Sequence, residues 1–160
     1  MARLYGKTVL IDSLIHNLRG EKIILDMDLA RIYGVTTKRL NEQGKRNAGR
    51  FPTDFAFCLS NLERQLLTEQ IAKSENPANR SQIATGSQKH RDPRFLPYAF
   101  TEHGALMAAK VLNSAQAVRM SVLVVRAFVR MRHILAAHKE LTGSYGNWNS
   151  RSARPTSRSK

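Results

Sequence analysis

Two short apolar runs near the start of the chain predict a β-hairpin. Leu14-Ile15 and residues 23–25 flank a polar connection at 19–22, which contains Gly20. A short polar connection with a glycine between apolar segments is typical of a hairpin turn. Residues 1–13 carry only a weak pattern, so we expect them to form a flexible N-terminus.

Residues 26–47 have helical spacing and predict two short helices joined by a tight turn. Apolar side chains recur at i, i+3 and i+4 from Leu29 to Tyr33, and Asp26 is placed to cap the start of this first helix. Gly34 can adopt the left-handed conformation that ends a helix. A threonine at position 36 or 37 can then cap the second helix, which is basic.

The second half of the chain predicts two more strands and three more helices around a polar loop. Residues 68–94 form a connection so long that we expect it to be mobile or functional, with a short strand at 81–85. Pro97 cannot donate a ladder hydrogen bond and indicates an edge position for its strand. The predicted elements are strands 55–59 and 94–100, a helix from Ser60 or Asn61 to Leu67, and helices 102–112 and 115–140.

Together these elements predict one α+β domain over residues 14–141. It contains a small antiparallel sheet, a helix-turn-helix-like pair and a long C-terminal helix. Helix 115–140 is apolar around most of its circumference, which is typical of the spine of a domain or of a dimer interface. Residues 142–160 are rich in Ser, Arg, Gly and Asn and have little to bury, so they predict a disordered basic tail.

The net charge favours a polyanionic partner. The 160 residues include 26 Lys and Arg against 12 Asp and Glu, a formal charge of +14. Such a charge favours nucleic acid first and an anionic membrane surface second. No apolar run reaches the ~18 residues that span a bilayer, and the N-terminus has no signal-peptide pattern. We therefore expect a cytoplasmic protein without a membrane partner.

Candidate residues for catalysis or metal binding are few. The single cysteine, Cys58, excludes an internal disulfide, and its apolar neighbours predict an inert buried thiol. Asp26 and Asp28 could hold a metal for phosphodiester cleavage, but two acids in the first turn of a helix are more simply explained by the helix dipole. The five histidines have no zinc-binding spacing. We expect no enzyme activity, no cofactor and no metal.

The second helix of the predicted pair carries the candidate DNA contacts. In a helix-turn-helix this helix enters the major groove. At 100° per residue, Leu40 and position 44 face the first helix and the polar residues face away, although Gly44 costs roughly 1 kcal/mol and predicts bending or fraying. Lysine suits guanine, asparagine suits adenine and arginine suits phosphate. We expect base contacts from Lys38, Asn41 and Lys45, and phosphate contacts from Arg39, Arg46 and Arg50.

An ordered series of short segments carries a family resemblance. They are Arg19-Gly20-Glu21, LDMDLARIYGV at 25–35, TKRLNE at 37–42, KRN at 45–47, RFPTDF at 50–55, SQI at 81–83 and LPYAFTEHG at 96–104. In this order they resemble the KilA-N family of DNA-binding domains, and most closely the subgroup named for an N-terminal region of phage open reading frame six proteins. The resemblance covers roughly residues 15–140. It implies an α+β, DNA-binding domain of phage, prophage and bacterial proteins, often linked to phage regulation.

Two hypotheses for the function follow. The first is a double-stranded DNA-binding protein, a phage- or prophage-type regulator that neutralises about five phosphates and has a slope of log K against log salt near −4 to −5. The alternative is an antirepressor-like interaction module that binds another protein, or a second copy of itself, through the apolar helix 115–140.

Overall fold

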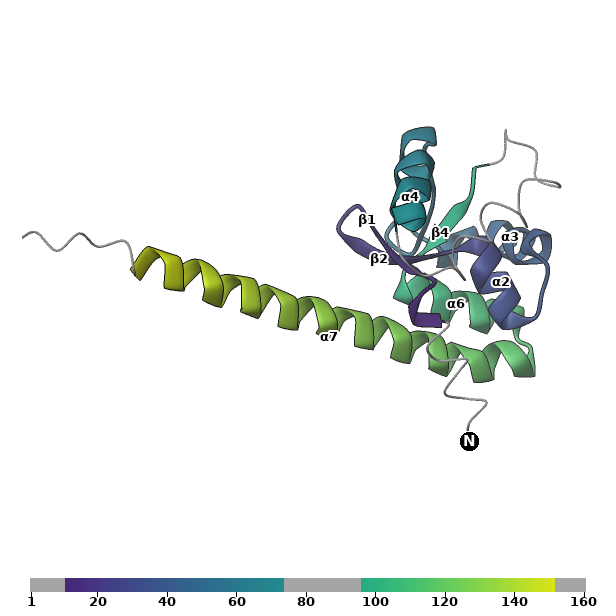
Figure 1. Ribbon diagram of the computed structural model, residues 1–160. Helices are drawn as coiled ribbons and strands as arrows, with labels where there is room; N and C mark the ends of the chain where they lie inside the picture. Colours follow the sequence, from purple (N-terminus) through teal and green to yellow (C-terminus); the bar gives the residue numbers. More distant parts are fainter. Residues whose placement is uncertain (1–10, 74–95, 152–160) are drawn as a thin grey trace, which may run out of the picture.

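The computed structural model describes residues 11–73 and 96–151, with side chains described up to residue 141. A four-stranded antiparallel sheet carries helices on both faces, and the last helix extends far beyond the body (Figure 1). The predicted α+β class is confirmed. The elements are β1 Ile15–Leu18, β2 Glu21–Leu25, α2 Asp26–Tyr33, α3 Thr37–Arg46, the 3-10 helix η1 Ala48–Arg50, β3 Ala56–Cys58, α4 Asn61–Lys73, β4 Tyr98–Phe100, α6 Glu102–Leu112 and α7 Ala115–Arg151.

The strands lie in the order β1-β2-β4-β3, so β4 is an inner strand. The edge position predicted from Pro97 is therefore wrong. Strand β4 begins one residue later, at Tyr98, and pairs with β2 on one side and β3 on the other. Because Pro97 lies just before the strand, its missing N–H removes no ladder bond. Its carbonyl accepts a hydrogen bond from the backbone N–H of Leu59 at 3.0 Å.

Successive side chains of the strands point to opposite faces of the sheet and contribute to two cores. On β2, Ile24 faces α2, α6 and α7, whereas Ile23 and Leu25 face α4. On β4, Phe100 and Ala99 divide in the same way. The sheet is therefore a middle layer, with α4 on one face and the helix pair, α6 and α7 on the other (Figure 1).

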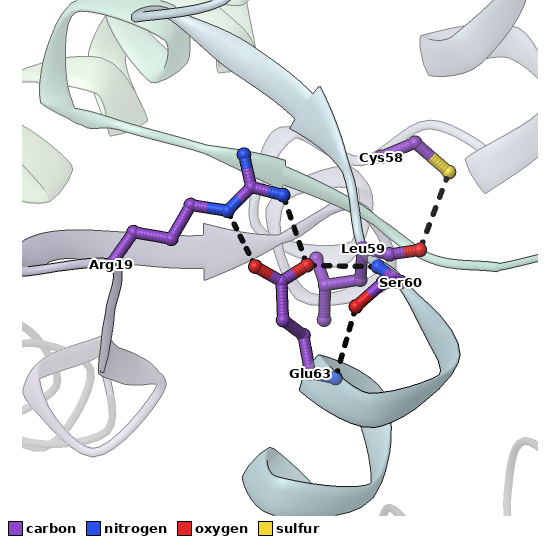
Figure 2. A network of polar contacts seen from close by, with 5 residues as sticks. All are labelled: Arg19, Cys58, Leu59, Ser60 and Glu63. Carbon is purple, nitrogen blue, oxygen red and sulfur yellow. Dashed lines mark hydrogen bonds and ion pairs between the residues drawn. The ribbon is translucent and has the colours of Figure 1, made fainter.

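The hairpin turn predicted at Gly20 is confirmed, and it contacts α4. Arg19 and Gly20 both adopt positive φ, at 54° and 76°, as a tight two-residue turn requires. The guanidinium of Arg19 lies 4.2 Å from the ring centre of Phe57. It also forms an ion pair with Glu63 on α4 (Figure 2). Ser60 and Glu63 exchange hydrogen bonds between side chain and backbone at the start of α4, which is a capping box. Arg19 and these bonds lower the pKa of Glu63 to about 2.

The predicted helix pair is confirmed, with two local differences. Gly34 ends α2 in the left-handed conformation, at φ 70°, and Thr36 caps α3 by accepting a hydrogen bond from the backbone N–H of Arg39 at 3.2 Å. Asp26 does not cap α2, because it is the first residue inside the helix and is fully buried. Helix α3 runs without interruption past Gly44 to Arg46, so the fraying predicted at this glycine is not seen.

Both ends of the described domain extend past their predicted limits. Ile11 is buried in the core, and Asp12 accepts a hydrogen bond from Arg130 on α7 at 2.8 Å. Residues 11–13 therefore belong to the domain, whereas the rest of the N-terminus predicted to be flexible, residues 1–10, lies outside the described residues. Helix α7 ends at Arg151 instead of residue 140, so the predicted tail begins as helix. Residues 152–160 are not described.

The region around Cys58 and the polar loop also differs from the prediction. Cys58 is exposed, because it ends the edge strand β3 after the buried Ala56 and Phe57. Helix α4 continues to Lys73, six residues beyond its predicted end at Leu67. The strand predicted at 81–85 falls in residues 74–95, outside the described part of the chain.

Candidate nucleic-acid interface

Helix α3 is held on the domain by its buried side and by its neighbour α2. Leu40 is 2% exposed and belongs to the larger core, which it shares with Tyr33 of α2. The hydroxyl of Tyr33 donates a hydrogen bond to the backbone carbonyl of Ala105 on α6 at 2.8 Å, and burial raises the pKa of this phenol. These contacts fix α2 on α6, and α3 is thereby presented on a rigid support.

The side of α3 opposite Leu40 carries four exposed cations. At 100° per residue, Lys38, Lys45, Arg46 and Arg39 fall within a sector of about 120°, centred opposite Leu40. All four are exposed, and so is Glu42, which lies in the same sector. The helix therefore presents a face with one acid and four cations, which we call the basic face of α3.

Arg50 adds a fifth exposed cation just beyond the end of α3. The next residue, Phe51, packs edge-on against Phe100 with ring centres 6.1 Å apart, so the backbone that carries Arg50 is anchored to the core. Within residues 11–73 and 96–151, none of the five cations forms an ion pair with an acid. Their positive charge is therefore available to a polyanion.

Asn41 has a different position from the five cations. Its side chain is half-buried, and its amide nitrogen donates a hydrogen bond to the carboxylate of Asp26 at 2.9 Å. A second oxygen of Asp26 accepts from the backbone N–H of Met27 at 2.8 Å. A buried carboxylate needs such donors, so Asn41 joins α3 to the start of α2. The sequence prediction instead placed Asn41 on the exposed side, because helical phase alone does not reveal a partner on another helix.

Asn41→Ala tests whether this residue holds the two helices together. Removing the amide leaves the buried carboxylate of Asp26 with one donor fewer, and we expect the free energy of unfolding to fall by about 2 kcal/mol. Denaturant unfolding measures the change. The exposed neighbour Glu42→Ala is the control and should stay within about 0.5 kcal/mol of wild type. An Asn41→Ala protein with wild-type stability would contradict the positioning role.

A second acid lies beneath the helix pair. Asp28 is buried in the first turn of α2, and burial raises its pKa to about 6, against the opposing effect of Arg31 and with a smaller contribution from Asp26.

No group of three or more His, Cys, Asp or Glu side chains that could hold a metal occurs among the described residues. Nor does any described helix combine the length and apolar character needed to cross a bilayer.

The comparisons with known proteins give one match. No curated protein and no solved structure matches the chain. A family model, described as the ORF6N domain, matches residues 13–111. The match extends from β1 to the last turn of α6 and so includes the sheet, the helix pair and every residue of the basic face of α3. Because it covers more than half of the 160 residues, the chain belongs to the ORF6N domain family.

Proposed function

We propose that this protein binds double-stranded DNA by placing α3 in the major groove, as a phage- or prophage-type regulator. The observation that carries the proposal is the basic face of α3, with Arg50 beside it. Its cations are exposed, lack acidic partners among the described residues and lie opposite a buried anchor. The glycine turn and the capped second helix support the same function, because a helix-turn-helix presents its second helix in this way.

The positions on the helix suggest a division of roles. Lys38 and Lys45 lie about two turns apart on the same side of α3, and lysine suits the acceptor atoms of guanine. Arg39, Arg46 and Arg50 flank them and are assigned to phosphates, which fix the protein on the duplex without reading sequence. Asn41, for which helical phase alone predicts a contact with adenine, is assigned to positioning α3 through Asp26.

The test is duplex binding by wild type and by Lys45→Glu/Arg46→Glu. Wild type should show a slope of log K against log salt near −4 to −5. On a random-sequence duplex Lys45 as well as Arg46 would neutralise a phosphate, so removing both contacts should weaken binding on the order of 100-fold at about 0.1 M salt and reduce the slope by about 2. Fluorescence anisotropy with a random-sequence duplex measures both, and selection of oligonucleotides from a random pool then gives the sequence preference.

The matched control places the same charge change on α4. Arg64 and Lys73 are exposed and form no ion pair within the described residues, so Arg64→Glu/Lys73→Glu lowers the net charge equally but leaves α3 intact. This variant should bind duplex within a few-fold of wild type. Equal losses in both variants would mean that attraction comes from net charge alone and would refute a role for α3.

Protein interaction through α7 is the second candidate function. Val118 and Val122 on this helix are 53% and 49% exposed. Clusters of exposed apolar side chains are typical of surfaces that bind a partner. Under this hypothesis the α3 variant would leave partner binding unchanged, whereas a polar substitution at the half-buried Val125 would weaken it.

A further inference from the structure

Helix α7 carries a regular apolar stripe along much of its length. Starting at Met120, apolar or aromatic residues recur with alternating steps of four and three, interrupted at one position by histidine. This spacing of 3.5 residues is the heptad repeat of coiled coils. The stripe consists of Met120, Val124, Ala127, Met131, Ile134, His138, Leu141, Tyr145 and Trp148, all within α7.

The domain covers only the first half of the stripe. Val124 and Ala127 are fully buried, and Met120 and Met131 pack partly buried against the same core. Arg132 still contacts the body, because its guanidinium pairs with Glu102 on α6 at 2.7 Å. The far part of α7 then extends away from the body (Figure 1). There Ile134 is 59% and Leu141 57% exposed. We call the second half, residues 131–148, the distal stripe.

We propose that the distal stripe pairs with the distal stripe of a second copy of this chain as a short coiled coil. The first half of the stripe already packs as a helix interface inside the domain, and the same spacing continues to Trp148 with His138 as its one polar member. A self-complementary stripe on each copy is what a two-fold dimer requires. The segment is about 27 Å long.

The distribution of charge favours a second copy in spite of the charge of +14. In a coiled coil the positions that flank the seam, e and g, lie close to the partner helix, and like charges there repel. Between Met131 and Trp148 these positions are uncharged. The arginine and the lysine of this segment both fall at b, away from the partner helix. The e and g residues are Leu135, Ala137, Thr142 and Ser144. The two cations at b are Lys139 and Arg132, and Arg132 is already paired with Glu102 of its own domain at 2.7 Å.

The domain also lowers the cost of forming the helix. An isolated helix of this length is marginal in water, because its first turn is costly to nucleate. Here residues 115–131 are already helical and packed on the core, so the distal stripe only continues an existing helix. This compensates for Gly143 and Gly146, which lower helix propensity.

The test is the molar mass of the full chain in the absence of DNA, measured by sedimentation over a dilution series. Wild type should have the mass of two chains and dissociate to one on dilution. Ile134→Glu/Leu141→Glu should have the mass of one chain at every concentration, with unchanged thermal unfolding of the domain. A wild type that is monomeric throughout would overturn the proposal.

Val118→Glu/Val122→Glu is the matched control. These valines lie on the same helix and are about as exposed as Ile134 and Leu141, but they fall outside the stripe. The control should remain dimeric, and a dimer that is lost here or that survives Ile134→Glu/Leu141→Glu would place the interface elsewhere. Trp148 is the only tryptophan, so its emission should shift to the red as wild type dissociates. An emission that does not change on dissociation would exclude Trp148 from the interface and overturn the proposed stripe.

Discussion

Gly104→Ala is expected to destabilise the domain more than the same substitution at any other glycine among the described residues. Gly104 lies in the first turn of α6, where a Cβ atom would come within 1.9 Å of the carbonyl oxygen of Phe55 and 2.8 Å of its carbonyl carbon. Both atoms are backbone, so no side-chain rotation relieves the overlap. The free energy of unfolding should fall by about 3 to 5 kcal/mol, measured by denaturant unfolding.

The same carbonyl explains why the backbone cannot move aside cheaply. The oxygen of Phe55 accepts hydrogen bonds from the backbone N–H of Thr101 at 2.9 Å and from its hydroxyl at 3.2 Å. Thr101 also caps α6. Displacing the carbonyl would therefore weaken the junction between the segment before β3 and the start of α6, on which α2 is anchored through Tyr33.

Gly44→Ala is the matched control for this prediction. Gly44 also lies inside a helix, but a Cβ atom there would meet nothing within 4 Å. Alanine has the higher helix propensity, so this variant should gain about 1 kcal/mol. A Gly104→Ala protein within about 1 kcal/mol of wild type would contradict the close approach of α6 to Phe55.

The parts of the fold with local sequence signals could be predicted. The helix pair follows from a glycine that ends α2, a threonine that caps α3 and apolar residues with helical spacing, all within about 20 residues. The hairpin follows from Gly20 between two apolar runs. The exposed cations of α3 also follow from helical phase once Leu40 is taken as the buried anchor. These features depend on neighbours in the sequence.

Features that depend on distant residues could not be predicted. The inner position of β4 results from pairing with both β2 and β3. Pro97 gave a wrong prediction of an edge position because it lies one residue outside the strand. The side chain of Asn41 points towards the domain because it binds the buried Asp26. The only sequence signal for this contact was the position of Asp26 directly after the apolar run 23–25. The same limit applies to α7: its apolar composition did not show which half of the helix the domain covers.

Asp28 and His16 are expected to give the domain opposite dependences of stability on pH. Asp28 is buried, and its pKa rises from 3.8 to about 6. Between these values the folded state holds a proton that the unfolded state has lost, so stability falls as pH rises. His16 on β1 is half-buried near Lys22, and burial followed by that charge lowers its pKa from 6.5 to about 4. Between these values the unfolded state holds the extra proton, so stability rises with pH.

The two effects overlap between about pH 4 and pH 6 and should nearly cancel in wild type, because each contributes about 1.4 kcal/mol per pH unit with opposite sign. The Asp28→Asn variant should retain only the effect of His16, so the stability of this variant should fall as pH drops from 6.5 to 4. His16→Gln should leave the Asp28 effect, so its stability should rise as pH drops from 6 to 4. Urea unfolding at half-unit pH steps measures the slopes, and parallel curves for the two variants would contradict both assignments. At pH 7 Asp28→Asn should be more stable than wild type by up to about 3 kcal/mol, since it no longer buries a charge beneath the helix pair.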